Sequence, residues 1–232
     1  MELHIIAHAH NGFSQKFGIP RQSREDSLIE TRIVFTPTYR VRESLRGIEE
    51  YSHLWLLWGF HEAIRRDGNE ATSNEWTPTV RPPRLGGNKR MGVFATRSPF
   101  RPNPLGLSCV QIDRIELDTP DGPVIHVRGA DLMDGTPIYD IKPYIKYADS
   151  RPHSVCGYVD SLQERSLKVV LPEEISAKVD DKSVLPALVQ TLGLDPRPSY
   201  HNDPEREYGL SFAGLNVRFK VSDNVLTVID ID

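Results

Sequence analysis

The apolar segments of this chain are short and are interrupted by glycine and proline, and this pattern constrains the fold more than any other feature. The longest, LWLLWGF at 54–60, is far shorter than the roughly 18 residues that a membrane-spanning helix needs. Short apolar runs bounded by turn residues favour strands over helices. We therefore expect a mainly β protein, with strands near 4–9, 32–35, 54–60, 92–96, 107–117 and 124–130.

The last two expected strands are joined by a segment that is typical of a hairpin turn. The residues DTPDGP at 118–123 combine Asp-Gly with proline, which suits a tight turn. Many short strands with few helices indicate a small barrel or a sandwich. No Gly-x-Gly-x-x-Gly motif follows a strand, so the sequence does not support a Rossmann nucleotide site. Residues 42–51 are expected to form a short helix that stops near Gly47.

The composition changes after about residue 148, which predicts a second, smaller α+β domain. A helix is expected at 184–193, ending at Gly193, and two strands at 210–221 and 224–231. We place a β-barrel domain at 1–153 and the second domain at 154–232.

Charge and cysteine content exclude several classes of protein. The 232 residues carry a formal net charge of -4, which argues against binding nucleic acid through overall charge. The two cysteines lie far apart, so neither a disulfide framework nor a zinc cluster is expected, and no histidine spacing predicts a metal. The first ten residues do not resemble a secretory signal. These features predict a cytoplasmic protein with reduced thiols.

One segment runs against this acidic background. Residues 81–108, RPPRLGGNKRMGVFATRSPFRPNPLGLS, contain five arginines, one lysine, five prolines and four glycines, and no acidic residue. Proline stiffens the backbone and glycine allows it to approach a ligand closely. Arginine offers paired donors to a carboxylate or a phosphate. The segment predicts a shaped loop for an anionic partner, although a solvated basic loop is the plain alternative.

Smaller candidates lie elsewhere in the chain. Acidic residues in the segment 129–145 could accept hydrogen bonds from hydroxyl or amine groups, or they could simply cap turns. His61 and Glu62 end an expected strand, and Arg197 and Tyr200 lie in the rigid turn DPRPSY. These residues leave two alternatives open: a non-catalytic RNA-binding barrel, or a metal enzyme that uses His61 and the aspartates.

Five strings occur in an order that resembles one known family. They are PRQS at 20–23, SHLWLLWGFH at 52–61, TVRPPRLGGNKRMGVFATRSPFRPNPLGLS at 79–108, DLMDGTPIYDIKPY at 131–144 and DPRPSY at 195–200. The sequence resembles the TsaA-like, or TrmO, family of tRNA methyltransferases over nearly its whole length. The resemblance implies an S-adenosylmethionine-dependent enzyme that methylates N6 of N6-threonylcarbamoyladenosine at position 37 of threonine tRNA. It also implies a non-Rossmann β-barrel, a homodimer, and a C-terminal domain that helps to bind the anticodon arm.

The resemblance also implies roles for individual residues. Two departures stand out: Glu62 occupies a position where the family pattern implies glutamine, and the segment 65–74 is long for the family. The residues implied to bind tRNA are Arg84, Arg90, Arg101, Arg197 and Tyr200. The residues implied to contact the cofactor are Pro20, Arg21, Gln22, His61, Glu62, Arg97, Leu107, Asp131, Leu132, Met133 and Asp134.

The chemistry that these roles imply is a displacement at a methyl group. Arg21 or Arg97 would hold the methionyl carboxylate of the cofactor, and Asp131 or Asp134 its amine or ribose. Positioning of the acceptor nitrogen in line with the methyl–sulfur bond would supply much of the rate. The nitrogen must also lose a proton, and we expect Asp134 to accept it, with His61 as the second candidate.

Overall fold

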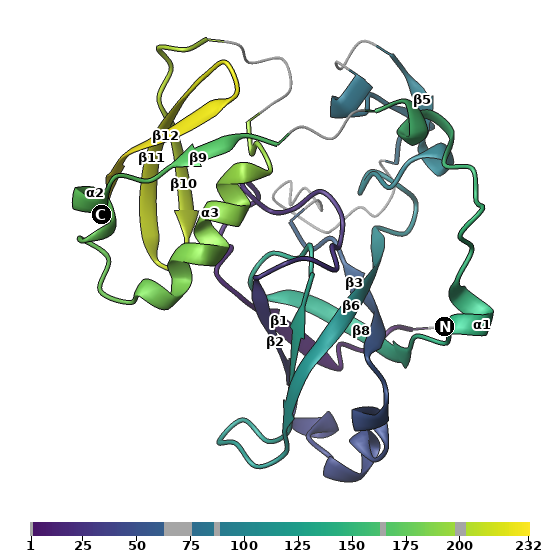
Figure 1. Ribbon diagram of the computed structural model, residues 1–232. Helices are drawn as coiled ribbons and strands as arrows, with labels where there is room; N and C mark the ends of the chain where they lie inside the picture. The colour runs from purple at the N-terminus through teal and green to yellow at the C-terminus, as the bar shows by residue number, and fades with distance from the viewer. Residues whose placement is uncertain (1, 63–75, 86–88, 163–165, 198–202) are drawn as a thin grey trace, which may run out of the picture.

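Six antiparallel strands in the N-terminal part of the chain close into a barrel in the computed structural model, which describes residues 2–62, 76–85, 89–162, 166–197 and 203–232 (Figure 1). Around the barrel the strands follow the order β1-β2-β7-β6-β3-β8, so the expectation of a mainly β fold with a small barrel is confirmed. The strands are β1 (Ala7–His10), β2 (Glu30–Phe35), β3 (His53–Gly59), β6 (Leu105–Glu116), β7 (Val124–Arg128) and β8 (Thr136–Pro143).

Alternation along the strands fills the barrel with apolar side chains. In β1 the small residues Ala7 and Ala9 point inward, and Leu54 and Leu56 do the same in β3. Successive side chains of a strand point to opposite faces, so the intervening residues remain available to the outside. The interior of the barrel is therefore a packed core, and a ligand must bind at its rim or on its outer face.

Two sequence expectations for this domain are wrong. Residues 92–96 do not form a continuous strand: β5 (Met91–Gly92) pairs with β4 (Thr79–Val80), and Val93–Ala95 form a 3-10 turn. The expected helix at 42–51 is divided into two 3-10 turns, Arg42–Leu45 and Ile48–Glu50, because Gly47 between them takes a positive φ of 87°. Further 3-10 turns lie at Pro37–Tyr39 and Pro83–Leu85.

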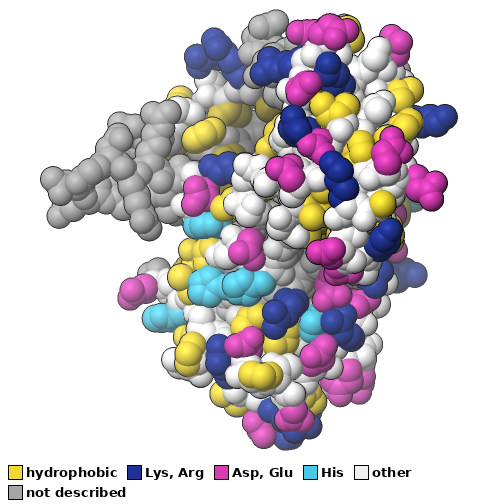
Figure 2. All heavy atoms as spheres, turned by 90° about the vertical axis from the view of Figure 1, so that its left-hand side faces the viewer, with side chains coloured by type: hydrophobic (Ala, Val, Ile, Leu, Met, Phe, Trp, Pro, Cys, Tyr) yellow, Lys and Arg dark blue, Asp and Glu magenta, His cyan; other side chains and the backbone are white. Residues whose placement is uncertain are grey.

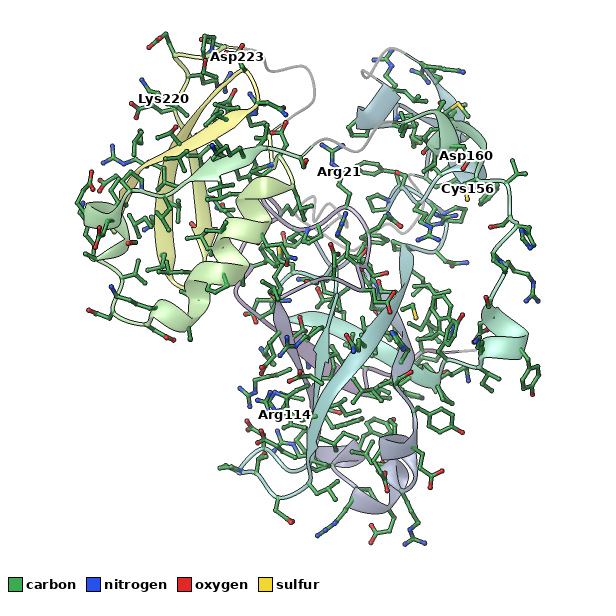
Figure 3. All side chains as sticks on the ribbon, in the orientation of Figure 1. Arg21, Arg114, Cys156, Asp160, Lys220 and Asp223 are labelled. Atoms are coloured by element: carbon green, nitrogen blue, oxygen red, sulfur yellow. The ribbon has the colours of Figure 1, made fainter. Side chains whose placement is uncertain are left out.

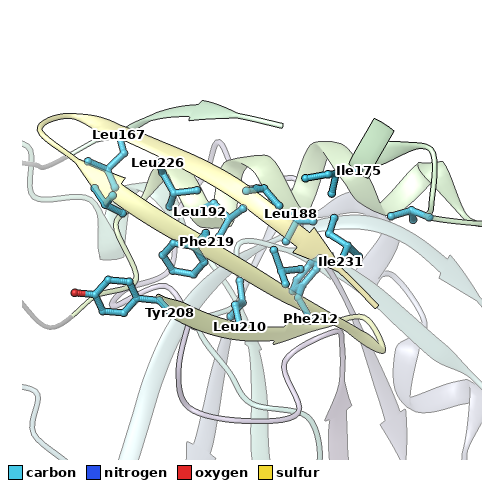
Figure 4. Packing of buried hydrophobic residues seen from close by; sticks show 14 of the residues in the cluster. Leu167, Ile175, Leu188, Leu192, Tyr208, Leu210, Phe212, Phe219, Leu226 and Ile231 are labelled. Atoms are coloured by element: carbon cyan, nitrogen blue, oxygen red, sulfur yellow. The ribbon is translucent and has the colours of Figure 1, made fainter. Parts of the chain in front are cut away.

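The C-terminal part is a four-stranded sheet with the order β10-β11-β12-β9, covered on one face by helices (Figure 1). Figure 4 shows leucine, isoleucine and phenylalanine side chains packed between the sheet and α3. Among the described residues, no helix has the length and apolar character needed to cross a membrane. The elements are β9 (Lys168–Val170), α2 (Glu173–Ser176), a 3-10 turn (Lys182–Val184), α3 (Leu185–Gly193), β10 (Tyr208–Phe212), β11 (Leu215–Ser222) and β12 (Val225–Ile231).

The expected strand at 210–221 is in fact a hairpin. Ala213 and Gly214 have positive φ values of 51° and 81°, which turns the chain between β10 and β11. Two consecutive positive φ values give the turn whose twist matches that of paired strands. The expected helix at 184–193 is present as α3, and its Pro186 lies in the first turn, where a missing amide is tolerated.

Two connections without strands complete the architecture. A long connection between β1 and β2, residues 11–29, runs from the barrel along the C-terminal domain and back; we call it the strap. Its purple trace passes between α3 and the top of the barrel in Figure 1. On the other side, α1 (Lys146–Asp149) and the 3-10 turn Gly157–Ser161 lie in the segment that leads from β8 to β9.

Candidate functional site

A cavity of about 860 Å³ opens at one end of the barrel. The strap contributes one wall, the ends of β3 and β6 contribute the floor, and residues 97–103 close the opposite side. Figure 3 shows Arg21 above the end of the barrel, between the C-terminal sheet and the β4–β5 segment. Residues 131–136 complete the lining, so four segments that are distant in sequence, 16–22, 55–62, 97–107 and 131–136, contribute to one site, as is common for cavities at the mouths of barrels.

Aromatic side chains form the floor of the cavity. Trp58 and Phe60 contact each other edge to face, with ring centroids 4.3 Å apart. Gly106 on the neighbouring strand leaves space for the indole, because a Cβ atom there would lie 2.2 Å from Trp58 Cε2. The close approach of Gly106 thus fixes the Trp58 ring, and the result is an apolar aromatic surface that suits an aromatic ligand group.

A partly buried carboxylate, that of Asp131, lies beside this floor. The Trp58 indole donates to Ser108 Oγ at 2.9 Å, and Ser108 Oγ donates to Asp131 Oδ1 at 2.5 Å. Burial raises the pKa of Asp131 above its usual range, against the lowering effects of the Ser108 hydrogen bond and the Arg97 charge. A desolvated carboxylate at a cavity wall attracts a cationic ligand group strongly.

Cationic side chains surround the same cavity. Arg97 donates to the side-chain oxygen of Gln22, which links the loop after β5 to the strap. Lys16 donates to the Glu62 carbonyl at 2.9 Å, and Arg101 donates to the Thr96 carbonyl at 3.2 Å. The cavity therefore offers both a carboxylate and several guanidinium or ammonium groups, a combination suited to a ligand with charges of both signs.

Histidines gather next to this site. His8 lies near His10 and His61, and its pKa is lowered by burial and by those two neighbours. Figure 2 shows histidines grouped on this face, among interleaved acidic and basic side chains. Within the ranges that the structure describes, no three His, Cys, Asp or Glu side chains are arranged to hold a metal ion.

The structure brings most of the expected cofactor residues into one place and leaves two of them out. Leu132 is 1% exposed and belongs to the barrel core, and Asp134 bonds to His10 Nδ1 at 3.2 Å and to the Asn11 amide at 3.1 Å. Neither side chain lines the cavity. The expected residues that do line it are Pro20, Arg21, Gln22, His61, Glu62, Arg97, Leu107, Asp131 and Met133.

The residues expected to bind tRNA are dispersed. Arg101 lines the cavity, and Arg90 is exposed and donates to Thr79 Oγ1 at 2.8 Å. Arg197 is only 8% exposed and pairs with Asp195, so its guanidinium is turned into the C-terminal domain rather than toward solvent. The Arg84 side chain, Tyr200 and the segment 65–74 lie outside what the structure describes.

Several cavity residues were not identified from the sequence. Trp58, Phe60 and Phe100 are ordinary core candidates by pattern. Ser108, which does not line the cavity but donates to Asp131 behind it, has no local signal at all. The only available clue was that Trp58 and Ser108 lie within strings shared with the family. Their roles depend on pairing between β3 and β6, which places Trp58 opposite Gly106.

Comparisons with known proteins agree with this geometry. The family model described as tRNA-methyltransferase O N-terminal domain matches residues 8–150, and the model described as TrmO C-terminal domain matches residues 164–232. A crystal structure of TrmO from Pseudomonas aeruginosa superimposes with a TM-score of 0.76 and 28% sequence identity, covering 100% of this chain and 98% of that one.

Curated relatives are similar over comparable lengths. A protein of Escherichia coli K12 named tRNA (adenine(37)-N6)-methyltransferase is 36% identical over 218 residues, covering 91% of this chain and 89% of the relative. A protein of Eikenella corrodens with the same name is 40% identical over 178 residues, covering 77% and 95%. A Pseudomonas aeruginosa relative, 33% identical with coverage of 97% and 95%, carries a provisional name as an S-adenosylmethionine-dependent methyltransferase. The two matching domains and these relatives confirm the resemblance seen in the sequence, and the chain belongs to the TrmO family of tRNA methyltransferases.

Proposed function

We propose that this protein uses S-adenosylmethionine to methylate N6 of the adenosine at position 37 of threonine tRNA, after that base has received its threonylcarbamoyl group. The observation that carries the proposal is that one cavity joins an aromatic floor, a partly buried carboxylate and several cations. Membership of the TrmO family and the names of the relatives support the reaction.

The residues of the cavity fit the parts of S-adenosylmethionine. The floor formed by Trp58 and Phe60 suits an adenine ring, and Leu107 adds exposed apolar surface. Arg97 suits the methionyl carboxylate, and Asp131 suits the amine or the adjacent positive charge. The cofactor supplies an electrophilic methyl group on a sulfonium.

Holding the acceptor base and removing its proton would be the work of the protein. His61 lines the cavity at the end of β3, so its imidazole could accept the N6 proton. The sequence favoured Asp134 for this role, but Asp134 lies outside the cavity and is engaged by His10 and Asn11. We therefore assign proton transfer to His61 and attraction of the cofactor's positive charge to Asp131.

Recognition of tRNA would depend on local charge, since the chain as a whole is acidic. Position 37 lies in a single-stranded loop, where a protein can read a base without opening a duplex. Arg101 at the cavity is placed to receive the threonyl carboxylate, and the exposed Arg90 to receive phosphate. Such a substrate would place the protein in the cytoplasm.

A second copy of the chain would cover the open side of the site. Phe100 and Leu107 line the cavity and are 52% and 55% exposed, and Phe94 on the same projecting segment is 72% exposed. Exposed apolar groups of this size beside a binding site are typical of an interface. We propose a homodimer that buries them, which analytical ultracentrifugation of wild type and of Phe94→Glu would test.

The experiment for the reaction uses purified protein, methyl-labelled cofactor and two preparations of threonine tRNA. One preparation carries the threonylcarbamoyl group at position 37 and the other lacks it. We expect label only on the modified tRNA, located at that base by nuclease digestion and mass spectrometry. Equal labelling of both, or labelling of neither, would refute the substrate assignment.

A further inference from the structure

The strap that forms one wall of the cavity is fastened to the C-terminal domain along its length. Phe13 is 0% exposed and belongs to the apolar core of that domain, and its ring contacts Phe212 with centroids 5.1 Å apart. Ile29, at the other end of the strap, is buried in the same core. An N-terminal segment has therefore become part of a core formed by residues from the end of the chain.

Close backbone contacts add to this attachment. The Ala213 amide donates to the Gly12 carbonyl at 2.8 Å. Gly18 has a φ of 95°, and a Cβ atom there would lie 2.3 Å from Leu210 Cδ1, so the strap approaches β10 as closely as glycine permits. Figure 4 shows Leu210 and Phe212 along β10. Gly18 of the strap contacts Leu210, and Phe13 of the strap contacts Phe212.

A single glutamine clamps the returning half of the strap. Gln190 on α3 accepts from the Leu28 amide at 2.7 Å and donates to the Asp26 carbonyl at 2.6 Å. The two bonds use both ends of one side-chain amide, so the α3 surface fixes both the position and the direction of the strap.

The middle of the same strap enters the cavity. Pro20, Arg21 and Gln22 line it, and the Gln22 side chain accepts from Arg97. The strap touches the barrel beside this point, where the Arg24 amide donates to the Gly129 carbonyl at 3.2 Å. The barrel domain also holds the first half of the strap, where the Asp134 amide donates to the Phe13 carbonyl at 2.8 Å and Lys16 donates to the Glu62 carbonyl. The C-terminal domain holds the strap on both sides of its cavity-lining residues.

We propose that the C-terminal domain positions the strap and so sets the affinity of the barrel for its cofactor. The inference rests on the proposed function in one respect, the identity of the cofactor. Phe13, Gly18 and Gln190 are then positioning residues: they do not line the cavity, yet they hold the segment that does. Coupling of this kind is reciprocal, so cofactor binding must also stabilise the contacts between the strap and β10.

The first experiment measures cofactor affinity by calorimetry in strap variants. Phe13→Ala and Gly18→Ala should release the strap from the C-terminal domain. If only about a tenth of the molecules then keep the strap docked and able to bind cofactor, the apparent Kd rises about tenfold. Gln190→Ala removes only the two clamping bonds and should raise the Kd by a smaller factor. The matched control is Gly47→Ala, since Gly47 also has a positive φ, of 87°, but has open space around it and lies far from the strap.

A second control separates positioning from general weakening of the C-terminal core. Leu226 on β12 is fully buried and lies two strands away from β10. Leu226→Ala should destabilise that core and leave the Kd of the folded protein within about twofold of wild type. Unchanged affinity in Phe13→Ala and Gly18→Ala would overturn the proposal, and so would an equal loss in Leu226→Ala.

Hydrogen exchange of the unsubstituted protein tests the same coupling without any variant. Cofactor should slow exchange at the amides of β10, at Leu210 and Phe212, as well as around the cavity. Protection confined to the barrel would overturn the proposal. In the free protein, Gly18→Ala should speed exchange at residues 21–23, and this arm needs no ligand. Failure of wild type to bind S-adenosylmethionine would refute the proposed function, whereas unchanged exchange at 21–23 would refute the positioning role.

Discussion

Replacement of Arg197 by alanine should strongly destabilise the C-terminal domain rather than simply weaken tRNA binding. Arg197 and Asp195 are each only 8% exposed. The guanidinium donates to both carboxylate oxygens, with Nε–Oδ1 at 2.8 Å and Nη2–Oδ2 at 3.1 Å. Its carbon also lies 6.0 Å from the centre of the Tyr208 ring. The substitution therefore leaves a buried carboxylate without its charge partner.

The size of the effect follows from that unpaired carboxylate. Removal of one partner of a buried ion pair costs about 3–5 kcal/mol. A domain of ordinary stability has about 5–15 kcal/mol in total. The loss would thus be a large fraction of the free energy of unfolding, well above the roughly 0.5–1 kcal/mol of an exposed cation next to an aromatic ring.

Urea unfolding, followed by circular dichroism and by exchange of the β10 and β11 amides, would measure this loss. The double variant Asp195→Asn with Arg197→Ala should recover part of it, because no buried charge remains. The matched control is Arg206→Ala, since Arg206 lies over the same ring at 5.5 Å but is exposed. We expect that control to change the free energy of unfolding by less than about 1 kcal/mol.

The opposite result would have a clear meaning. If Arg197→Ala unfolds at the same urea concentration as wild type and binds tRNA more weakly, the guanidinium contacts RNA as the family resemblance implies. The buried pair with Asp195 would then not describe the protein in solution, and the stability argument would fail.

Three other substitutions test the site and the barrel. Gly106→Ala should lower the free energy of unfolding by about 1–3 kcal/mol through overpacking, because its Cβ would displace Trp58. The displaced ring should also weaken cofactor binding. Calorimetry and indole fluorescence would measure the loss of stability and the loss of affinity. Cofactor affinity should rise as the pH increases through the raised pKa of Asp131, because the ionised carboxylate attracts the cofactor's positive charge, and Asp131→Asn should remove this rise in calorimetry. Hydrogen bonds from Arg114 lower the pKa of Glu30 from 4.5 to about 2, so the resulting stability is present above pH 4.5 and is lost as the pH falls toward 2. Glu30→Gln should flatten that part of the acid-unfolding curve, and a curve identical to wild type would refute the assignment.

Much of the fold could be predicted because its signals are local. Short apolar runs placed β2 and β3, and alternation of apolar and polar residues placed β6 and β7, to within a few residues of their bounds. The failures were also local in origin: Gly47 and the Ala213–Gly214 pair take positive φ values that split an expected helix and an expected strand. The strand β8 was missed because its prolines and aspartate suggested a turn, whereas pairing with β1 and β3 overrides that preference.

The sequence by itself determined the mainly β class, the family and, through the family resemblance, part of the cavity lining, because those features reside in short strings of the chain. Only the tertiary structure shows that Asp131 lines the cavity and Asp134 does not, although the two residues lie in one short segment. Ser108 of β6 donates to Asp131 at the cavity, and Asp134 is bonded to His10 of β1. In the same way, Phe13 joined a core formed far along the chain. Contacts between distant residues leave no trace in local pattern, because their energy depends on which strands become neighbours.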